Sequence, residues 1–319
     1  MKGTVIRNTG MHYIVATDDG REIDCRIKGN FRIKGIRTTN PVAVGDRVEI
    51  KIGEKGEASW ITKIEPRRNY IIRRASNLSK ESHIIGANID AAMLVVSLFH
   101  PTTSTNFIDR FLATAEAYSV EAVISINKVD LLVDEDEKDY LDAITYLYRS
   151  IGYKVLHLSA RTGLGLDDLR HILHGKTTLM AGNSGVGKTS LINDLIPGLN
   201  LRTGAISDTH DTGMHTTTFS ELFTLPPINE CDTNPGSIID TPGVRGFGTI
   251  DFDKYETAHY FREIFETSKN CRFNNCTHTH EPGCAVLRAV ENNKIAQSRY
   301  TSYMSILEDT AEDKYRKPY

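Results

Sequence analysis

Three patterns predict that this chain of 319 residues folds as a multidomain protein with a β-barrel, an α/β domain and a small helical domain. Short runs in which apolar and polar residues alternate fill residues 2–64, as in small all-β domains. Strand-like and helix-like runs then alternate from residue 89 to residue 240, which is typical of a parallel sheet covered by helices on both faces. After residue 251, a cluster of cysteine and histidine is flanked by helical patterns. We therefore expect domains at residues 1–68, 69–250 and 251–319.

The composition fits a globular protein, with 39% hydrophobic and 25% charged residues. The longest apolar run, Ala91 to Phe99, is interrupted by Ser97 and is too short to span a bilayer, so we expect no membrane partner and a cytoplasmic location. The five cysteines are an odd number for a disulfide framework and favour a reduced compartment with a metal site.

The first domain combines a barrel pattern with positive charge. Its expected strands are residues 4–6, 13–16, 22–27, 47–50 and 58–64, and five short strands fit a barrel of the OB type, which commonly binds nucleic acid. Residues 1–74 hold 16 Lys+Arg against 9 Asp+Glu, a net charge of +7, so the remainder must carry −10 to give −3 overall. Arg32, Lys34 and Arg37 in the long middle loop are the predicted phosphate contacts. The alternative is a small β-domain whose surface is merely basic.

The second domain is expected to begin after a polar, basic linker at residues 66–74. Asp134 and Glu137 have the spacing of a capping box before a long helix. The other expected strands are residues 89–99, 121–126, 154–158, 177–181 and 237–239, and the other expected helices are residues 106–118, 166–173 and 191–196.

A phosphate-binding loop lies between the last of these helices and the strand before it. Its residues fit G-x-x-x-x-G-K-[ST], and the alternative is a merely tight glycine turn. Backbone N–H groups of such a loop surround phosphate oxygens, while Lys188 reaches the β- and γ-phosphates and the Thr189 hydroxyl is available to Mg²⁺. The predicted loop residues are Gly182, Asn183, Ser184, Gly185, Val186, Gly187, Lys188, Thr189 and Ser190.

Two further motifs predict that the nucleotide carries guanine. Asn127, Lys128 and Asp130 form N-K-x-D directly after a strand. The Asp130 carboxylate can accept the N1–H and the exocyclic amine of guanine, a donor pair that adenine lacks, so the motif selects GTP over ATP. Ser159 and Ala160 end the next strand and are expected to offer a backbone N–H to the guanine O6. Alone, each motif could be a solvated turn, but together at strand ends they indicate a nucleotide site.

The γ-phosphate side is expected to involve Asp240 and Gly243, which follow the strand at 237–239. A polar, glycine-rich loop at residues 213–218 is expected to offer a threonine to Mg²⁺. Thr217 is the selected ligand, although the pattern does not distinguish it from its two threonine neighbours.

The residue that orients the attacking water is not obvious from the motifs. Val244 occupies the position after the D-x-x-G glycine, and its side chain cannot hydrogen-bond. We expect His215 to act instead, because an imidazole can orient water near neutral pH. The alternative is a solvated His215 and slow intrinsic hydrolysis.

The order of these motifs is unusual, because base recognition at Asn127 and Ser159 precedes the phosphate loop. The sequence therefore predicts a circularly permuted GTPase, in which new termini in surface loops leave the sheet and the site intact.

The third domain contains a predicted structural Zn²⁺ site made of three thiols and one imidazole within 14 residues. His280 is a competing ligand by spacing, and free thiols with a surface histidine are the alternative. Helices at residues 254–268 and 285–307 are expected to pack on this knuckle. The predicted ligands are Cys271, Cys276, His278 and Cys284.

This combination of basic barrel, permuted GTPase motifs and Cys-x4-Cys-x-His-x5-Cys resembles the ribosome small-subunit-dependent GTPase A family (RsgA, also called YjeQ) over essentially the whole chain. The resemblance implies a late-acting assembly GTPase that binds the small ribosomal subunit and its rRNA, hydrolyses GTP to GDP in response, and departs; we expect a monomer. The rivals are another RNA-linked GTPase, such as a translation or tRNA-modification factor, and a non-catalytic RNA-binding scaffold. Intact Lys188, Thr189 and Asp240 argue against the scaffold.

Overall fold

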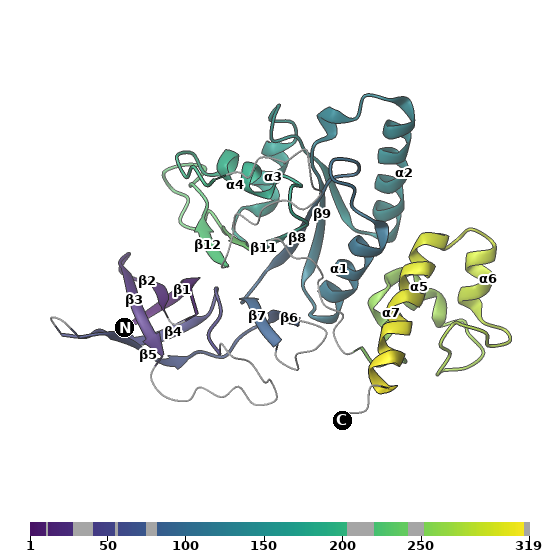
Figure 1. The fold of residues 1–319 in the computed structure, drawn as a ribbon, viewed down its shortest axis with the longest axis horizontal. Coiled ribbons are helices and arrows are strands. Elements are labelled where there is room, and N and C mark those ends of the chain that lie inside the picture. Colours follow the sequence, from purple (N-terminus) through teal and green to yellow (C-terminus); the bar gives the residue numbers. More distant parts are fainter. Residues whose placement is uncertain are drawn as a thin grey trace.

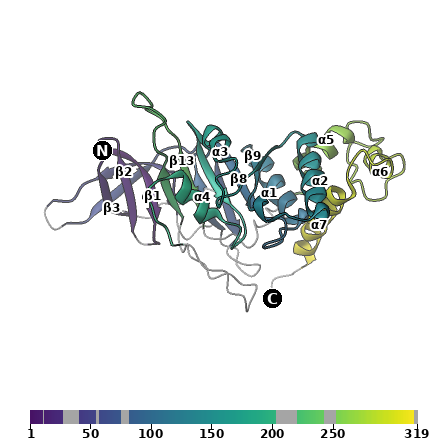
Figure 2. The same ribbon diagram turned by 90° about the horizontal axis from the view of Figure 1, so that it is seen from above.

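A computed structural model describes residues 1–10, 12–27, 41–54, 57–74, 82–202, 220–241 and 252–315. Three units follow one another along the long axis of the molecule, with a β-barrel at the N-terminal end, an α/β domain in the middle and a helical unit at the C-terminal end (Figures 1 and 2). Among the described residues, no helix is long and apolar enough to cross a membrane.

The N-terminal unit is the expected barrel of five strands. The strand order in the sheet, β1-β2-β3-β5-β4, closes on itself because β4 also pairs with β1. Val5, Val15 and Ile61 are fully buried inside it, which is the inward face that the alternating pattern predicts. Its strands are β1 (Lys2–Asn8), β2 (Tyr13–Thr17), β3 (Glu22–Ile27), β4 (Arg47–Lys51) and β5 (Ser59–Ile64).

The interpretation of residues 66–74 as a linker is wrong. Tyr70–Arg74 forms β6, which pairs with β7 (Ser82–Ala87) as an antiparallel two-stranded sheet. Part of the charge that suggested a linker is neutralised inside the fold, because Arg67 Nε lies 2.6 Å from Asp46 Oδ1 and the Asp46 side chain is fully buried. Ile71 is also fully buried. This basic stretch therefore anchors the barrel to the next domain.

The central domain contains the expected mostly parallel sheet. Its order is β10-β9-β8-β11-β13-β12, and all pairs are parallel except β12 with β13. The antiparallel edge strand β12 was not predicted, and it also pairs with β1 of the barrel, which joins the two units into one sheet of 11 strands. The strands are β8 (Ala91–Val96), β9 (Glu121–Ile126), β10 (Lys154–His157), β11 (Thr177–Ala181), β12 (Glu221–Thr224) and β13 (Ser237–Asp240).

Helices cover both faces of this sheet, each packed through its own apolar cluster. On one face lie α1 (Thr105–Ala117) and α2 (Glu135–Ile151), which bury Phe111 and Tyr148. On the other lie α3 (Leu166–Leu173) and α4 (Lys188–Leu195). A short 3₁₀ turn η1 (Val129–Leu131) follows β9, and its Val129 packs against the cluster of the first face.

The capping box predicted at the start of α2 forms only in part. Asp134 is the N-cap residue, but its side chain makes no capping hydrogen bond. The Glu137 carboxylate accepts the N–H of Val133, one residue before the cap, at 3.1 Å. The reciprocal pair of bonds that defines a capping box is therefore absent.

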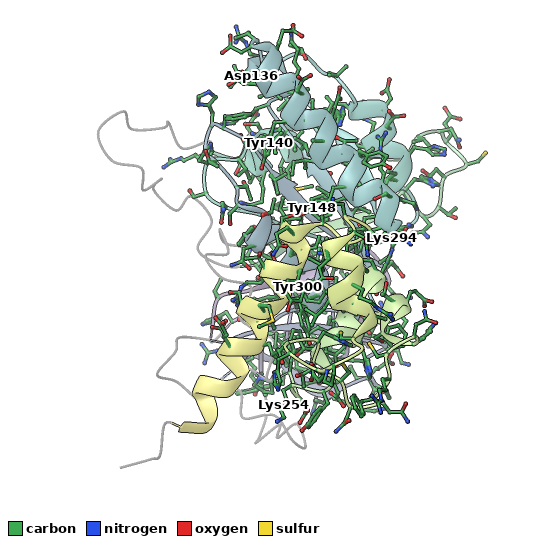
Figure 3. The ribbon with its side chains drawn as sticks, turned by 90° about the vertical axis from the view of Figure 1, so that its right-hand side faces the viewer. Asp136, Tyr140, Tyr148, Lys254, Lys294 and Tyr300 are labelled. Atoms are coloured by element: carbon green, nitrogen blue, oxygen red, sulfur yellow. The ribbon has the colours of Figure 1, made fainter. Side chains whose placement is uncertain are left out.

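The C-terminal unit has shorter helices than predicted. Its elements are η2 (Thr257–Tyr260), α5 (Arg262–Ser268), α6 (Ala285–Glu291) and α7 (Gln297–Tyr315). The helix expected at 254–268 therefore begins only at Arg262, after a 3₁₀ turn. The helix expected at 285–307 breaks after Glu291, because Asn293 adopts a left-handed φ of 55°. The break lets α7 turn back onto α1 (Figure 3).

A buried charge cluster holds this unit on the central domain. Arg299 of α7 is 1% exposed and contacts Asp109 of α1 at 2.7 Å and Glu263 of α5 at 2.6 Å. Tyr148 of α2 donates to the same Asp109 carboxylate at 2.8 Å. Removing one member of a buried ion pair costs about 3–5 kcal/mol, so this cluster fixes α7 against α1.

Candidate functional site

The phosphate-binding loop connects β11 to α4, as predicted, and two of its glycines are required by close contacts. Gly182 has φ 150°, and a Cβ there would lie 2.1 Å from the Val95 carbonyl oxygen. Gly187 has φ 97°, and a Cβ there would lie 2.3 Å from Asn127 Nδ2. Any side chain at either position would disturb the loop, so these close contacts explain why the motif has glycine at both positions.

Lys188 lies inside this loop and is 8% exposed. Its Nζ donates to the carbonyl oxygens of Gly182 at 2.7 Å and Asn183 at 2.9 Å. Burial lowers the pKa of Lys188 to about 8, against the opposing effect of the Asp240 carboxylate. Two carbonyl groups thus hold the ammonium group within the loop. A bound phosphate could take the place of these carbonyls as its hydrogen-bond acceptor.

Asn127 ties the base-recognition side to the phosphate loop. Its Nδ2 donates to the Val186 carbonyl at 2.9 Å, and its Oδ1 accepts the Ala160 N–H at 3.2 Å. The Ser159 N–H donates to Leu164. The predicted contact from this backbone to a guanine O6 therefore requires the Ala160 N–H to be shared with, or released from, Asn127.

Asp130 is oriented by the serine that follows the next strand. The Ser159 hydroxyl donates to Asp130 Oδ1 at 2.6 Å and in turn accepts the Thr162 N–H at 3.1 Å. Two segments that are 29 residues apart in the chain thus meet because β9 and β10 are neighbouring parallel strands with their carboxyl ends at one edge. The carboxylate has a fixed direction before any ligand binds.

Lys128 takes a left-handed φ of 65°, and its Nζ donates to the His100 carbonyl at 2.6 Å. Burial lowers the pKa of Lys128. The loop before α1 therefore contacts Lys128, and its Pro101 lies 3.7 Å from where a Cβ on Gly185 would be. This loop contains no motif, so the sequence did not indicate its contact with Lys128.

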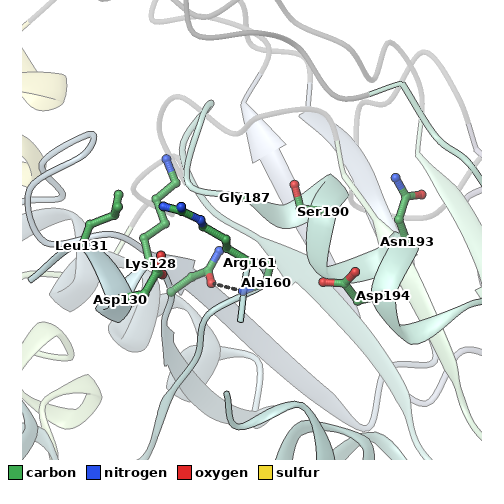
Figure 4. Close-up of a pocket in the computed structure, with 10 residues that line it drawn as sticks. Lys128, Asp130, Leu131, Ala160, Arg161, Gly187, Ser190, Asn193 and Asp194 are labelled. Carbon is green, nitrogen blue, oxygen red and sulfur yellow. Dashed lines mark hydrogen bonds between the residues drawn. The ribbon is translucent and has the colours of Figure 1, made fainter. Parts of the chain in front are cut away.

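The segments that follow β9 and β10, together with Gly187 and α4, line a pocket of about 390 Å³ (Figure 4). Leu131, Arg161, Asn193 and Asp194 were not predicted to lie there. Leu131 and Arg161 directly follow predicted residues, and Asn193 and Asp194 lie three and four positions after Ser190, so helical spacing could have found them. The lining residues are Asn127, Lys128, Asp130, Leu131, Ala160, Arg161, Gly187, Ser190, Asn193 and Asp194.

Asp240 ends β13 beside the phosphate loop and is 2% exposed. Its carboxylate acts electrostatically on Lys188, and the next side chain, Thr241, donates to the Met180 carbonyl of β11 at 3.0 Å. Thr189 follows Lys188 in the first turn of α4. The structure thus brings these predicted residues to one edge of the sheet.

Several predicted residues lie outside the part of the chain that the structure describes. They include the candidate that orients water, one Mg²⁺ ligand, one γ-phosphate contact and the phosphate contacts of the barrel. These residues are His215, Thr217, Gly243, Arg32, Lys34 and Arg37.

The four predicted metal ligands converge, and their ligand atoms all lie within 4.8 Å of one another. Cys271 Sγ lies 3.9 Å from Cys284 Sγ, and His278 Nδ1 lies 3.6 Å and 3.5 Å from these two sulfurs. Ligands at about 2.3 Å (sulfur) and 2.0–2.1 Å (nitrogen) in a tetrahedron are separated by about 3.5–3.8 Å. These separations, with three thiols and one imidazole, fit a closed metal site.

The surrounding backbone supports the same four atoms. The Ala285 N–H points at Cys271 Sγ at 3.3 Å, and Cys284 caps α6. Tyr300 donates to the His278 carbonyl at 2.8 Å. The competing candidate His280 is exposed and bonds to the neighbouring Thr279 hydroxyl at 2.8 Å. The geometry therefore favours His278 over His280.

Glu281 stiffens the turn between the ligands by accepting N–H groups from Thr277 at 2.6 Å and Thr279 at 2.9 Å. Burial favours its neutral form, but hydrogen bonds from Thr277 and neighbouring backbone N–H groups outweigh this and lower the pKa of Glu281. A charged carboxylate thus holds the turn in place.

Comparison with known proteins places this arrangement in one family. The family model described as "RsgA GTPase" matches residues 64–250, and that described as "RsgA N-terminal domain" matches residues 2–61. The chain belongs to the RsgA family. The circular permutation and the three-part architecture that the sequence predicted agree with this membership.

Curated RsgA relatives match over their whole length. A "small ribosomal subunit biogenesis GTPase RsgA" of Porphyromonas gingivalis is 60% identical over 321 residues, with 100% of both chains covered. One of Bacteroides fragilis is 59% identical over 319 residues, also with 100% of both chains covered.

Two solved structures of RsgA-like proteins share the fold. YjeQ from Thermotoga maritima has a TM-score of 0.74 and 33% identity, covering 97% of this chain and 98% of its own. YloQ, described as a circularly permuted GTPase, has a TM-score of 0.70 and 33% identity, covering 100% of this chain and 96% of its own.

Proposed function

We propose that this RsgA family member binds the small ribosomal subunit and hydrolyses GTP to GDP and phosphate during late maturation of that subunit. Nucleotide binding is supported by the pocket, because Asp130 and Gly187 both line it. Asn127 connects its two sides by hydrogen bonds to Val186 and Ala160. The ribosomal part is supported by the names of relatives that match along the full chain.

In the proposed site, the base and the phosphates are held by different strand ends. Asp130 selects guanine, Lys188 and the loop N–H groups hold the phosphates, and Asp240 lies beside the metal-bound phosphates. The Thr189 and Thr217 hydroxyls would hold Mg²⁺, which neutralises phosphate charge when bound. The proposed nucleotide contacts are Asn127, Lys128, Asp130, Ser159, Ala160, residues 182–190, Asp240 and Gly243.

His215 is proposed to orient the attacking water, because Val244 cannot. The imidazole lies next to threonines in a loop expected to close over the γ-phosphate. Basal hydrolysis is then slow, and the subunit accelerates it by ordering this loop.

The Cys/His cluster is proposed to hold one structural Zn²⁺ through Cys271, Cys276, His278 and Cys284, because three thiolates and one imidazole leave no open coordination position. The barrel, residues 1–68, is proposed to contact rRNA through Arg32, Lys34 and Arg37. The nucleotide domain then spans residues 69–250 and the zinc unit residues 251–319, in a monomeric cytoplasmic protein.

Co-sedimentation with purified small subunits tests this proposal. The protein should pellet with small subunits in the presence of a non-hydrolysable GTP analogue and be released with GDP. Lys188→Ala, which removes the cation of the phosphate loop, should lose the difference between the two nucleotides. Binding to tRNA with equal strength, or equal pelleting in both nucleotide states, would favour the rival tRNA-linked GTPase or the scaffold instead.

A further inference from the structure

Strand β12 lies between the barrel and the nucleotide domain and pairs with both (Figure 1). Within it, Glu221 is the direct antiparallel partner of Arg7 in β1 and of Asp240 in β13. Side chains of directly opposed residues project from the same face of a sheet, about 4.5–5.5 Å apart at Cβ. Arg7, Glu221 and Asp240 therefore form a row of side chains that crosses from the barrel to the nucleotide site.

This row holds one positive and two negative side chains, and the positive one comes from the barrel. Glu221 and Asp240 are two carboxylates placed directly opposite each other, an arrangement that like-charge repulsion destabilises. Arg7 Nε donates to Glu221 Oε1 at 2.9 Å, and Arg7 Nη2 forms an ion pair with the same oxygen. The hydrogen bond to Glu221 raises the pKa of Arg7. The barrel thus supplies the positive charge that neutralises Glu221.

Asp240 connects this row to the phosphate loop. Its buried carboxylate acts on Lys188 of the phosphate loop. Glu221 is therefore the direct cross-strand neighbour of the carboxylate that acts on the phosphate loop.

We propose that Arg7 of the barrel is a positioning residue for the nucleotide site, which acts through Glu221 to set the preference for GTP over GDP. This rests on the proposed function. GTP carries about one more negative charge than GDP, so an uncompensated Glu221 disfavours GTP more than GDP. If the phosphates bind roughly 10 Å from this charge, at an effective dielectric constant of about 50, Coulomb's law gives a change in preference of about three-fold.

If the effect is electrostatic, substitutions of Arg7 and of Glu221 should change the ratio of GTP-analogue affinity to GDP affinity in opposite directions. Arg7→Met leaves Glu221 uncompensated and should lower the ratio of GTP-analogue affinity to GDP affinity roughly three-fold. Glu221→Gln removes the negative charge and should raise that ratio. The double variant Arg7→Met/Glu221→Gln should return close to the wild-type ratio. A purely structural loss of the contact between β1 and β12 would move both single variants in the same direction.

The test is titration calorimetry of the full-length chain with GDP and with a non-hydrolysable GTP analogue, at fixed Mg²⁺ and at low and high salt. High salt should shrink the effect, because the Arg7 side chain is 48% exposed. The matched control is Arg47→Met, which breaks an ion pair with Asp18 at 2.8 Å in the same barrel without a partner in β12 or β13. It should leave the ratio unchanged.

Shifts in the same direction for both single variants, or unchanged ratios in both, would overturn the role of Arg7 while leaving guanine binding intact. A wild-type protein that binds neither guanine nucleotide would overturn the proposed function, and this inference with it. Thermal melting of each variant separates a loss of folding from a change in preference.

Discussion

At the scale of single residues, the proposed selection of guanine depends on the Asp130 carboxylate, which one hydroxyl orients. The Ser159 hydroxyl fixes Asp130 at 2.6 Å. Asp130→Asn replaces one acceptor with a donor, so it should weaken GDP binding by roughly 100-fold, since an unpaired polar group in a site is strongly rejected. Xanthine nucleotides, which present a carbonyl where guanine has its amine, should bind the variant better.

Calorimetry with GDP, XDP and ADP checks this first prediction. Asp136→Asn on the exposed surface of α2 is the control, and it should bind GDP like the wild type. An Asp130→Asn protein that keeps wild-type GDP affinity would remove Asp130 from the site.

The buried Lys188 gives nucleotide binding a pH signature. Its pKa of about 8 lies below the ordinary value of 10.5, mainly through burial. Bound phosphates should raise this pKa, so binding between pH 8 and pH 10.5 takes up a proton. At pH 8.5 we expect an uptake of about 0.7 proton, and at pH 7 almost none.

Calorimetry of GDP binding in buffers with different ionisation enthalpies measures this uptake. Lys188→Arg is the matched variant, because an arginine stays protonated throughout and should bind GDP with far less uptake. The same linkage makes the nucleotide-free protein more stable as the pH rises from 8 to 10.5, since the unfolded chain binds the additional proton. Equal uptake in both proteins would show that Lys188 is already charged.

At the scale of elements, sequence periodicity predicts most of the fold, and its failures have physical causes. All five barrel strands, and the strands β8, β9, β10, β11 and β13 that alternate with helices, follow from apolar patterns and turn residues. Strands β6 and β7 were missed, because the basic stretch that leads into β6 looks solvated in sequence although its Arg67 pairs with the buried Asp46. The four-residue β12 gives too short a pattern, and only its two neighbours define it.

The break between α6 and α7 could not be predicted, because asparagine is tolerated in a helix and only tertiary packing selects the left-handed turn at Asn293. The candidate site was easier to predict than these boundaries. Its motifs each carry one chemical role, whereas pocket residues such as Leu131 and Asp194 line the site only because neighbouring elements meet there.

The knuckle between α5 and α6 should depend on its metal. His278→Ala should lose most of the bound zinc and lower the melting temperature of the C-terminal unit, because the site closes the turn that carries the ligands. His280→Ala should keep about one zinc per chain. Measuring zinc content and thermal melting of both variants decides between the two histidines.

Cys231→Ser provides the control for general effects of thiol removal, since Cys231 is exposed and lies far along the chain from the cluster. Equal zinc contents in the wild type and the His278→Ala variant would contradict the ligand assignment.

At the scale of the whole molecule, the barrel is fixed to the nucleotide domain by the pairing of β1 with β12 and by the buried Arg67–Asp46 pair. Arg32, Lys34 and Arg37 are proposed to contact rRNA from this barrel. Neutralising all three should weaken subunit binding and reduce the slope of log affinity against log salt by roughly one unit for each lost phosphate contact.

Binding measured over a series of salt concentrations tests this. Lys138→Gln, which removes one positive charge from α2 rather than from the barrel, is the control and should leave the slope unchanged. An unchanged slope in the triple variant would exclude this loop as the RNA contact.

The central claim is that the small subunit switches on hydrolysis of GTP in this pocket. Its most direct test is GTP turnover by the purified protein in the presence and absence of saturating small subunits. Turnover of ATP and turnover by the Lys188→Ala variant are the negative controls. We predict slow turnover alone, strong stimulation by small subunits, no hydrolysis of ATP, and a His215→Ala variant that binds GTP but loses most of the stimulated rate. GTP turnover that is the same with and without small subunits would contradict the account.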